Sequence, residues 1–177
     1  EAFSDCSNLT SVSIGNSVET IGDYAFDFCY KLSELSLGNG IKRIGKEAFN
    51  STDIINLVIP DSVIELGEGA FEFNSNMKSL VIGKGLSEIP SNAFYECSEL
   101  SKVELSKGLT TIRSHAFSNC PKIEYLKLPS TIKKLESYFI SGANKLTAEY
   151  KGKTYILIKD GFATDEVNEL YKAIKAA

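Results

Sequence analysis

The dipeptide Ala-Phe recurs along this chain at a nearly fixed interval. Its six copies are Ala2-Phe3, Ala25-Phe26, Ala48-Phe49, Ala70-Phe71, Ala93-Phe94 and Ala116-Phe117. Successive copies lie 23 residues apart except for one interval of 22, and Phe139-Ile140 continues the period. A fixed period of this length is typical of a stacked repeat protein, in which one supersecondary unit is copied along an axis. We therefore expect a solenoid built from about six coils.

Aliphatic residues lie nine and eleven positions after each Phe, or eight and ten positions after Phe49 in the 22-residue coil. These pairs are Val12/Ile14, Leu35/Leu37, Leu57/Ile59, Leu80/Ile82, Val103/Leu105 and Leu126/Leu128. One residue separates the members of a pair, which is the period of a strand that faces the core with alternate side chains. Stacked coils then form a curved parallel sheet with strands roughly 4.8 Å apart. The residues predicted to be buried in these strands include Leu35, Leu37, Leu80, Ile82, Val103 and Leu105.

The segments between the strands carry turn residues. Ala-Phe is predicted to lie in a short helical or 3₁₀ turn opposite the sheet, where Ala allows close approach and Phe fills the layer between coils. The positions after the strands alternate between glycine and proline, at Gly15, Gly38, Pro60, Gly83 and Pro129. We expect glycine to turn the chain there through a positive φ and proline through its fixed φ.

The pattern Ile-Gly-x-x-Ala-Phe-x-x-Cys-x-x-Leu-x-x-Leu-x-Leu, read from residues 21–37, carries a family resemblance. It resembles the BspA-like (treponemal-type) leucine-rich repeat, an α/β-type leucine-rich repeat, and the resemblance covers residues 1–146. Thr52, Asn74 and Ala143 depart from the pattern by replacing Cys. The resemblance implies a secreted or cell-surface microbial protein that adheres to host proteins or to other cells.

The repeat ends near Leu146, which divides the chain into a solenoid (residues 1–146) and a C-terminal cap (residues 147–177). The cap is predicted to contain a hairpin over residues 147–158 and an amphipathic helix over residues 164–175, with Thr164 as N-cap. It either shields the last sheet edge or docks a following domain. The chain opens within a repeat, so we expect an N-terminally truncated fragment that lacks upstream coils and any export signal.

The composition and motifs favour a binding protein over an enzyme. The net charge of −4 argues against nucleic acid as a partner, and no apolar run is long enough to span a bilayer. His115, the single histidine, has no Ser, Cys or acid placed with it in the sequence, so no catalytic residues are predicted. The four cysteines share one repeat position, Cys6, Cys29, Cys97 and Cys120. We interpret them as reduced packing thiols and expect neither metal nor cofactor.

The candidate binding residues point outward from the predicted strands, between the core pairs. They are Val58, Val81, Lys102, Glu104, Tyr125 and Lys127. A rigid sheet face with apolar, charged and aromatic side chains suits a protein ligand, such as a host or microbial surface protein. Aromatic residues after Ala-Phe offer a second surface or pack on each other; they are Phe28, Tyr30, Phe73 and Tyr95. The alternative functions are a passive spacer or stalk, or a glycan-binding accessory region of a larger surface enzyme.

Overall fold

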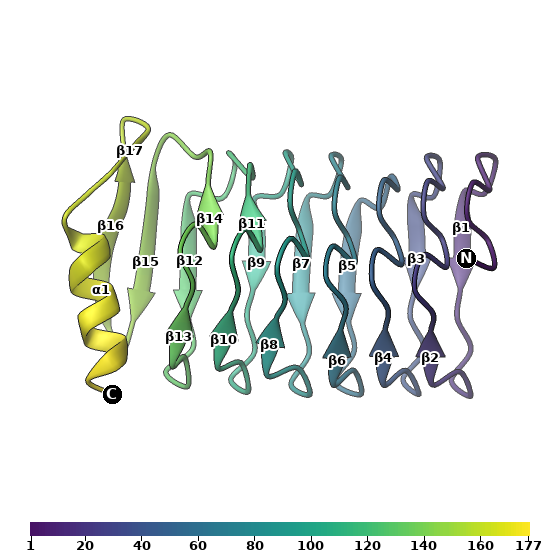
Figure 1. The fold of residues 1–177 in the computed structure, drawn as a ribbon, viewed down its shortest axis with the longest axis horizontal. Helices are drawn as coiled ribbons and strands as arrows, with labels where there is room; N and C mark the ends of the chain where they lie inside the picture. The colour runs from purple at the N-terminus through teal and green to yellow at the C-terminus, as the bar shows by residue number, and fades with distance from the viewer.

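The computed structural model describes residues 1–177 and shows the coils stacked in one row, with the N-terminus at one end and the helix α1 (Glu166–Lys175) at the other (Figure 1). Three segments of each coil bond to the equivalent segments of the neighbouring coils. Three backbone ladders therefore hold the stack together. The predicted solenoid with a parallel sheet and a C-terminal hairpin and helix is confirmed.

The first ladder is the main sheet. Its strands are β1 (Ser11–Ser13), β3 (Glu34–Ser36), β5 (Asn56–Ile59), β7 (Ser79–Ile82), β9 (Lys102–Glu104), β12 (Tyr125–Leu128) and β15 (Leu146–Tyr150). They pair in parallel, as predicted, within the groups β1-β3, β5-β7-β9 and β12-β15. No strand pairing joins β3 to β5 or β9 to β12. The main sheet therefore has two breaks.

The first break coincides with the 22-residue coil. Ile54 fills the core position there and is fully buried, but the deletion changes the register of the backbone amides before β5. Ile55 N bonds to Ser33 O at 3.3 Å, whereas in the preceding coil Ser33 N and Glu34 N both reach Thr10 O. A single missing residue thus interrupts the sheet without disturbing the core.

The breaks correct one prediction about burial. Leu80 and Ile82, in the middle of a paired group, are buried as expected. Four other residues lie beside a break and remain half-buried, namely Leu35, Leu37, Val103 and Leu105. These four lie in or directly after the strands on the N-terminal side of each break, whereas Leu57, Ile59, Leu126 and Leu128 on the other side are buried.

The second ladder joins short strands that follow the main sheet in each coil. They are β2 (Thr20–Ile21), β4 (Arg43–Ile44), β6 (Glu65–Leu66), β8 (Glu88–Ile89), β10 (Thr111–Ile112) and β13 (Lys134–Leu135). They pair in parallel as β2-β4-β6 and β8-β10-β13, with a break between β6 and β8. The two ladders are interrupted between different pairs of coils. Every pair of neighbouring coils is therefore joined by strand pairing in at least one of the two ladders.

The third ladder runs through the Ala-Phe turns and has no break. Phe26 N donates to Ala48 O at 2.8 Å, and an equivalent bond closes every joint from Phe3 to Phe117. At the C-terminal joint the ladder takes the form of the strand pair β11 (Phe117–Ser118) and β14 (Ile140–Ser141). The six Phe rings stack in parallel, with centroids 5.1 to 5.8 Å apart. The predicted layer of Phe between coils is confirmed.

The Ala-Phe segments are turns, as predicted, but they do not form helices. Isolated bonds of the 3₁₀ kind occur, such as Asp27 N to Tyr24 O at 3.4 Å. Two positions in the turn have a positive φ, one directly before Ala-Phe and one two residues after Phe, for example Tyr24 (57°) and Phe28 (57°). Left-handed residues end a helix within one turn, and they leave the Phe amides free to bond to the next coil.

The glycines after the strands have a different role from the one predicted. None of Gly15, Gly38 and Gly83 has a positive φ. A Cβ at Gly38 would lie 2.6 Å from Gly15 O, and one at Gly83 would lie 2.5 Å from Pro60 C. Glycine is required at these two positions because the backbones of neighbouring coils approach closely.

The cysteine position supplies a hydrogen-bond donor to the turn of the preceding coil. The thiols of Cys29, Cys97 and Cys120 donate to the carbonyls of Phe3, Phe71 and Phe94 at 3.1 to 3.5 Å. All four cysteines are free thiols, three of them buried. In the middle of the stack Asn74 does the same, because its Nδ2 donates to Phe49 O at 2.8 Å. This explains why Asn can replace Cys there.

The last coil is followed by a hairpin and the helix. The strand β16 (Lys153–Lys159) pairs antiparallel with β15, and β17 (Phe162–Ala163) covers only the end of β16. The outer edge of β16 is blocked by side chains: Glu166 Oε2 accepts from Ile156 N at 2.8 Å, and Thr164 Oγ1 donates to Ile156 O. The predicted N-cap was wrong. Asp165 holds that position, because the hydroxyl of Thr164 is engaged with the strand.

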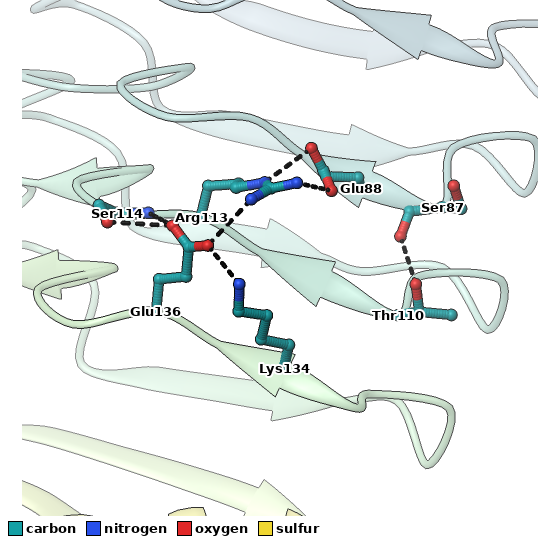
Figure 2. Close-up of polar contacts among 7 residues, drawn as sticks. All are labelled: Ser87, Glu88, Thr110, Arg113, Ser114, Lys134 and Glu136. Carbon is teal, nitrogen blue, oxygen red and sulfur yellow. Dashed lines mark hydrogen bonds and ion pairs between the residues drawn. The ribbon is translucent and has the colours of Figure 1, made fainter.

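A polar network replaces glycine at the joints between the later coils. The residue after β4 and β6 is Gly45 or Gly67, where a Cβ would collide with the preceding backbone, whereas Arg113 and Glu136 follow β10 and β13. Arg113 Nε and Nη2 bond to the two oxygens of Glu88 at 2.9 Å, and Arg113 Nη1 reaches Glu136 at 3.0 Å (Figure 2). Charged side chains thus bridge three successive coils.

Candidate binding face

The main sheet presents two columns of outward side chains, which lie in register as the period predicts. Val58, Val81 and Glu104 are direct partners across β5, β7 and β9, and Lys102 belongs to the neighbouring column with Ser79. Val58 is 61% exposed, Val81 is half-buried, and Lys102 and Glu104 are exposed. An aliphatic pair therefore lies beside charged groups on one rigid surface.

Tyr125 and Lys127 lie on the outward face of β12 and share one partner. The hydroxyl of Tyr125 donates to Glu149 Oε2 at 2.7 Å, and Lys127 Nζ lies 3.0 Å from Glu149 Oε1. The Tyr125 hydrogen bond, followed by that of Lys127, lowers the pKa of Glu149. The sequence analysis did not include Glu149 in this surface because it ended the repeat near Leu146. The strand β15 nevertheless continues the main sheet in parallel, and the pairing of Lys127 with Glu149 places the carboxylate there.

Two hollows open along this face. The first hollow, of about 810 Å³, is lined by residues of β3, β5, β7 and the turns that follow the strands, among them Leu37, Val58, Val81 and Ile82. The second hollow, of about 830 Å³, lies over the break between β9 and β12 and is lined by Tyr125, Lys127 and Glu149, among others.

The two hollows form one groove because both are lined by Glu104, Leu105 and Lys107. Of the six predicted binding residues, five line this groove. Lys102 does not; it faces a smaller depression with Asn56 and Ser79. The structure thus brings most of the predicted surface together and places Lys102 beside it.

The charges along the groove are only partly neutralised. Asp61 lies 3.5 Å from Lys84 Nζ, and Lys84 N donates to the carboxylate of Asp61 at 2.8 Å, which lowers the pKa of Asp61. Three charged residues that line the groove have no ion-pair partner, namely Glu104, Lys107 and Lys151. The Nζ of Lys151 lies 5.5 Å from the centre of the Tyr150 ring.

The aromatic residues of the turn face pack on each other while remaining partly exposed. Phe28 lies 5.8 Å from Tyr30 in the same coil, and Phe73 meets Tyr95 of the next coil edge to face at 5.6 Å. Such pairs stabilise neighbouring turns. The packing interpretation of Phe28 and Phe73 therefore has direct support.

His115 has neighbours that the sequence did not predict. Its ring stacks on Tyr138 at 5.8 Å, and its Nδ1 lies 3.2 Å from Ser118 Oγ. The expectation that no Ser accompanies His115 was wrong, because the turn folds residue 118 back over residue 115. Ser118 is buried and donates its hydroxyl hydrogen to Tyr138 O at 2.7 Å. The pair of His115 and Ser118 therefore stabilises the turn, and the Ser118 hydroxyl is not placed to act as a nucleophile.

No group of three or more His, Cys, Asp or Glu side chains is arranged to hold a metal ion. No helix has the length and apolar character that crossing a membrane requires.

A stack of 23-residue coils with a parallel sheet on one side defines a leucine-rich-repeat type of solenoid. The sequence profile described as BspA type leucine rich repeat region matches six copies over residues 1–94 and 73–160. The chain belongs to this family. A search of curated protein sequences gives no match.

Solved structures of bacterial proteins share the fold. The leucine-rich repeat protein of T. pallidum is 25% identical with a TM-score of 0.67, over 98% of this chain and 73% of that one. Leucine-rich repeat proteins of Bacteroides ovatus and Eubacterium ventriosum are 24% and 22% identical, with TM-scores of 0.65 and 0.59, over 85% and 73% of this chain. The present chain covers 45% and 42% of those two proteins, less than half of their length.

Proposed function

We propose that this chain is a non-catalytic, protein-binding segment of a secreted or cell-surface protein, and that it binds through the main sheet. The observation that carries the proposal is the groove, which combines an aliphatic column at Val58 and Val81 with charged groups and Tyr125. Side chains on a hydrogen-bonded sheet lose little further freedom on binding. An apolar centre with a polar rim is the composition of a modest protein interface.

Membership of the BspA-type repeat family supports a cell-surface or secreted location and a protein partner, because the resemblance implies surface-exposed adhesive proteins. In this proposal residues 1–146 are the binding unit. Residues 147–177 are a cap, and the engagement of the Ile156 backbone by Glu166 and Thr164 supports that role. The cap also contributes Glu149 to the groove.

The test is to identify a partner with the protein as bait and then to measure its dissociation constant with purified variants. Val81→Asp and Tyr125→Ala are expected to weaken binding about tenfold or more while the unfolding midpoint stays close to that of the parent. Phe28→Ala and Tyr95→Ala, on the turn face, serve as controls and are expected to bind normally. The reverse pattern would assign binding to the turn face. Normal binding by all four variants would contradict binding through the main sheet.

A further inference from the structure

The first hollow has an aliphatic floor with no aromatic side chain in its lining. Leu37, Ile59 and Ile82 form the floor, and Val58 and Val81 project beside them. A sugar ring is usually bound through stacking on an aromatic ring, which this hollow does not offer. A partner's aliphatic side chain would instead remove Val58 from water, and burial of such surface contributes about 25 cal/mol per Å².

Ser106 lines this hollow, but its hydroxyl is not exposed to a ligand. It occupies the turn position that holds Gly or Pro in the other coils, as at Gly83 and Pro129. Ser106 is only 8% exposed, and its Oγ has no hydrogen-bond partner. The Oγ atom itself has almost no solvent-accessible surface, so Ser106 contributes to the shape of the hollow and offers no hydrogen bond to a ligand.

The second hollow differs from the first in its charge. Glu149 is neutralised by Lys127 and Tyr125, which leaves the ammonium groups of Lys107 and Lys151 without carboxylate partners. Glu104, shared by both hollows, is the single unpaired carboxylate. Lys107, which lines both hollows, and Lys151, which lines only the second, are cations that complement an anionic ligand group, although the protein as a whole has a net charge of −4.

We propose that the groove binds an extended, acidic segment of a protein partner, which runs across the strands with an aliphatic side chain in the first hollow and carboxylates over Lys107 and Lys151. This inference rests on the proposed function and adds the chemistry and direction of the partner. Three strand spacings of about 4.8 Å, or roughly 14 Å, separate Val81 on β7 from β15. An extended chain covers this distance in about four residues.

The experiment uses a blocked synthetic peptide that carries one Leu and, about four residues later, two Glu, with Ser and Gly elsewhere. Binding is followed by amide chemical shifts of the full 177-residue protein. We expect saturable shifts at Val81, Ser106 and Lys107. Replacing the Leu by Ser, replacing both Glu by Lys, or placing Leu next to Glu should each weaken binding about fivefold or more.

Variants that change a charge or an apolar side chain of the groove have matched controls elsewhere. The control residues directly precede strands of the second ladder. Lys107→Glu and Lys151→Glu should each weaken peptide binding about fivefold, whereas Lys133→Glu, at an exposed lysine without an ion pair, should not. Val81→Asp should abolish saturable binding, whereas Ile64→Asp should leave it unchanged, although Ile64 is 63% exposed.

Ser106→Ala is a control within the first hollow, because it removes a hydroxyl that the ligand does not reach. Removing an unpaired buried hydroxyl should leave the unfolding midpoint unchanged or raised, and peptide binding should stay unchanged. Equal binding of the Glu and Lys peptides, or shifts confined to the turn face, would overturn this inference. If an identified protein partner still loses affinity with Val81→Asp and Tyr125→Ala, the proposed function would stand without it.

Discussion

The Ala-Phe face and the main sheet are built from the same repeat, yet they tolerate variation to different degrees. The Ala-Phe ladder has a hydrogen bond at every joint, and its Phe rings stack from one coil to the next. The main sheet is broken twice and keeps exposed valine and unpaired charge on its outer surface. The difference indicates that stability resides in the turn ladder, which leaves the sheet face free to acquire binding residues.

Removal of a ring from the Phe stack is the strongest test of this comparison. Phe71 is fully buried between Phe49 and Phe94. Phe71→Ala should lower the free energy of unfolding by about 3 to 5 kcal/mol, because a large cavity opens in the core. Val58→Ala, on the exposed sheet face, should cost less than about 1 kcal/mol. Similar losses in urea denaturation would contradict the assignment of stability to the turn ladder.

The buried polar position after Phe should have the next largest effect. Asn74 donates to Phe49 O and Phe71 O at 2.8 and 3.1 Å and accepts from Ile54 N at 3.2 Å. Asn74→Ala leaves Ile54 N unpaired and removes the closer donor from each carbonyl, so that Phe49 O keeps only Thr52 Oγ1 and Phe71 O only the Cys97 thiol. The variant should cost about 2 to 3 kcal/mol in the free energy of unfolding. Asn74→Cys restores one donor, as in the other coils, and should recover part of the loss. Equal losses for both variants would show that volume alone matters here.

Glu72 introduces a pH-dependent weakness into the turn face. Burial, followed by repulsion from Glu47, Glu68 and Glu96, raises its pKa from 4.5 to about 7, against a smaller opposing effect of Lys46. The folded state therefore holds its proton more tightly than the unfolded state. Stability should fall as pH rises between these two values and then stay constant.

Glu72→Gln should remove this dependence. Since Glu72 is partly exposed, solvent screening reduces the effect, and we expect the variant to be more stable by about 1 kcal/mol above pH 7 and equally stable below pH 4. Thermal unfolding at a series of pH values measures the difference. A constant gap between the two proteins at all pH values would rule out titration of Glu72 as its source.

Periodicity was sufficient to predict the stack, the parallel strands and the Phe layer because each depends on a residue type repeated in every coil. It could not predict the sheet breaks, since these depend on a one-residue deletion near Ile54 and on backbone spacing between particular coils. The left-handed turn positions were missed because residues as different as Tyr24 and His115 occupy them. At the candidate site the columns followed from the period. Glu149 and Ser106 did not, because Glu149 lies beyond the predicted end of the repeat at Leu146 and Ser106 replaces the Gly or Pro of the pattern.

The smallest expected effect concerns the contact between the sheet face and the cap. Tyr125→Phe removes the hydroxyl that donates to Glu149 at 2.7 Å, on a surface where we expect little contribution to stability. The unfolding midpoint should therefore stay unchanged. The pKa of Glu149 should rise toward its ordinary value because the largest cause of its lowering is lost, while Lys127 continues to hold it partly down. A carboxyl ¹³C titration of both proteins measures this shift. If the midpoint falls substantially, the sheet face carries stability after all; if the pKa of Glu149 does not move, the hydroxyl does not bond to it in solution.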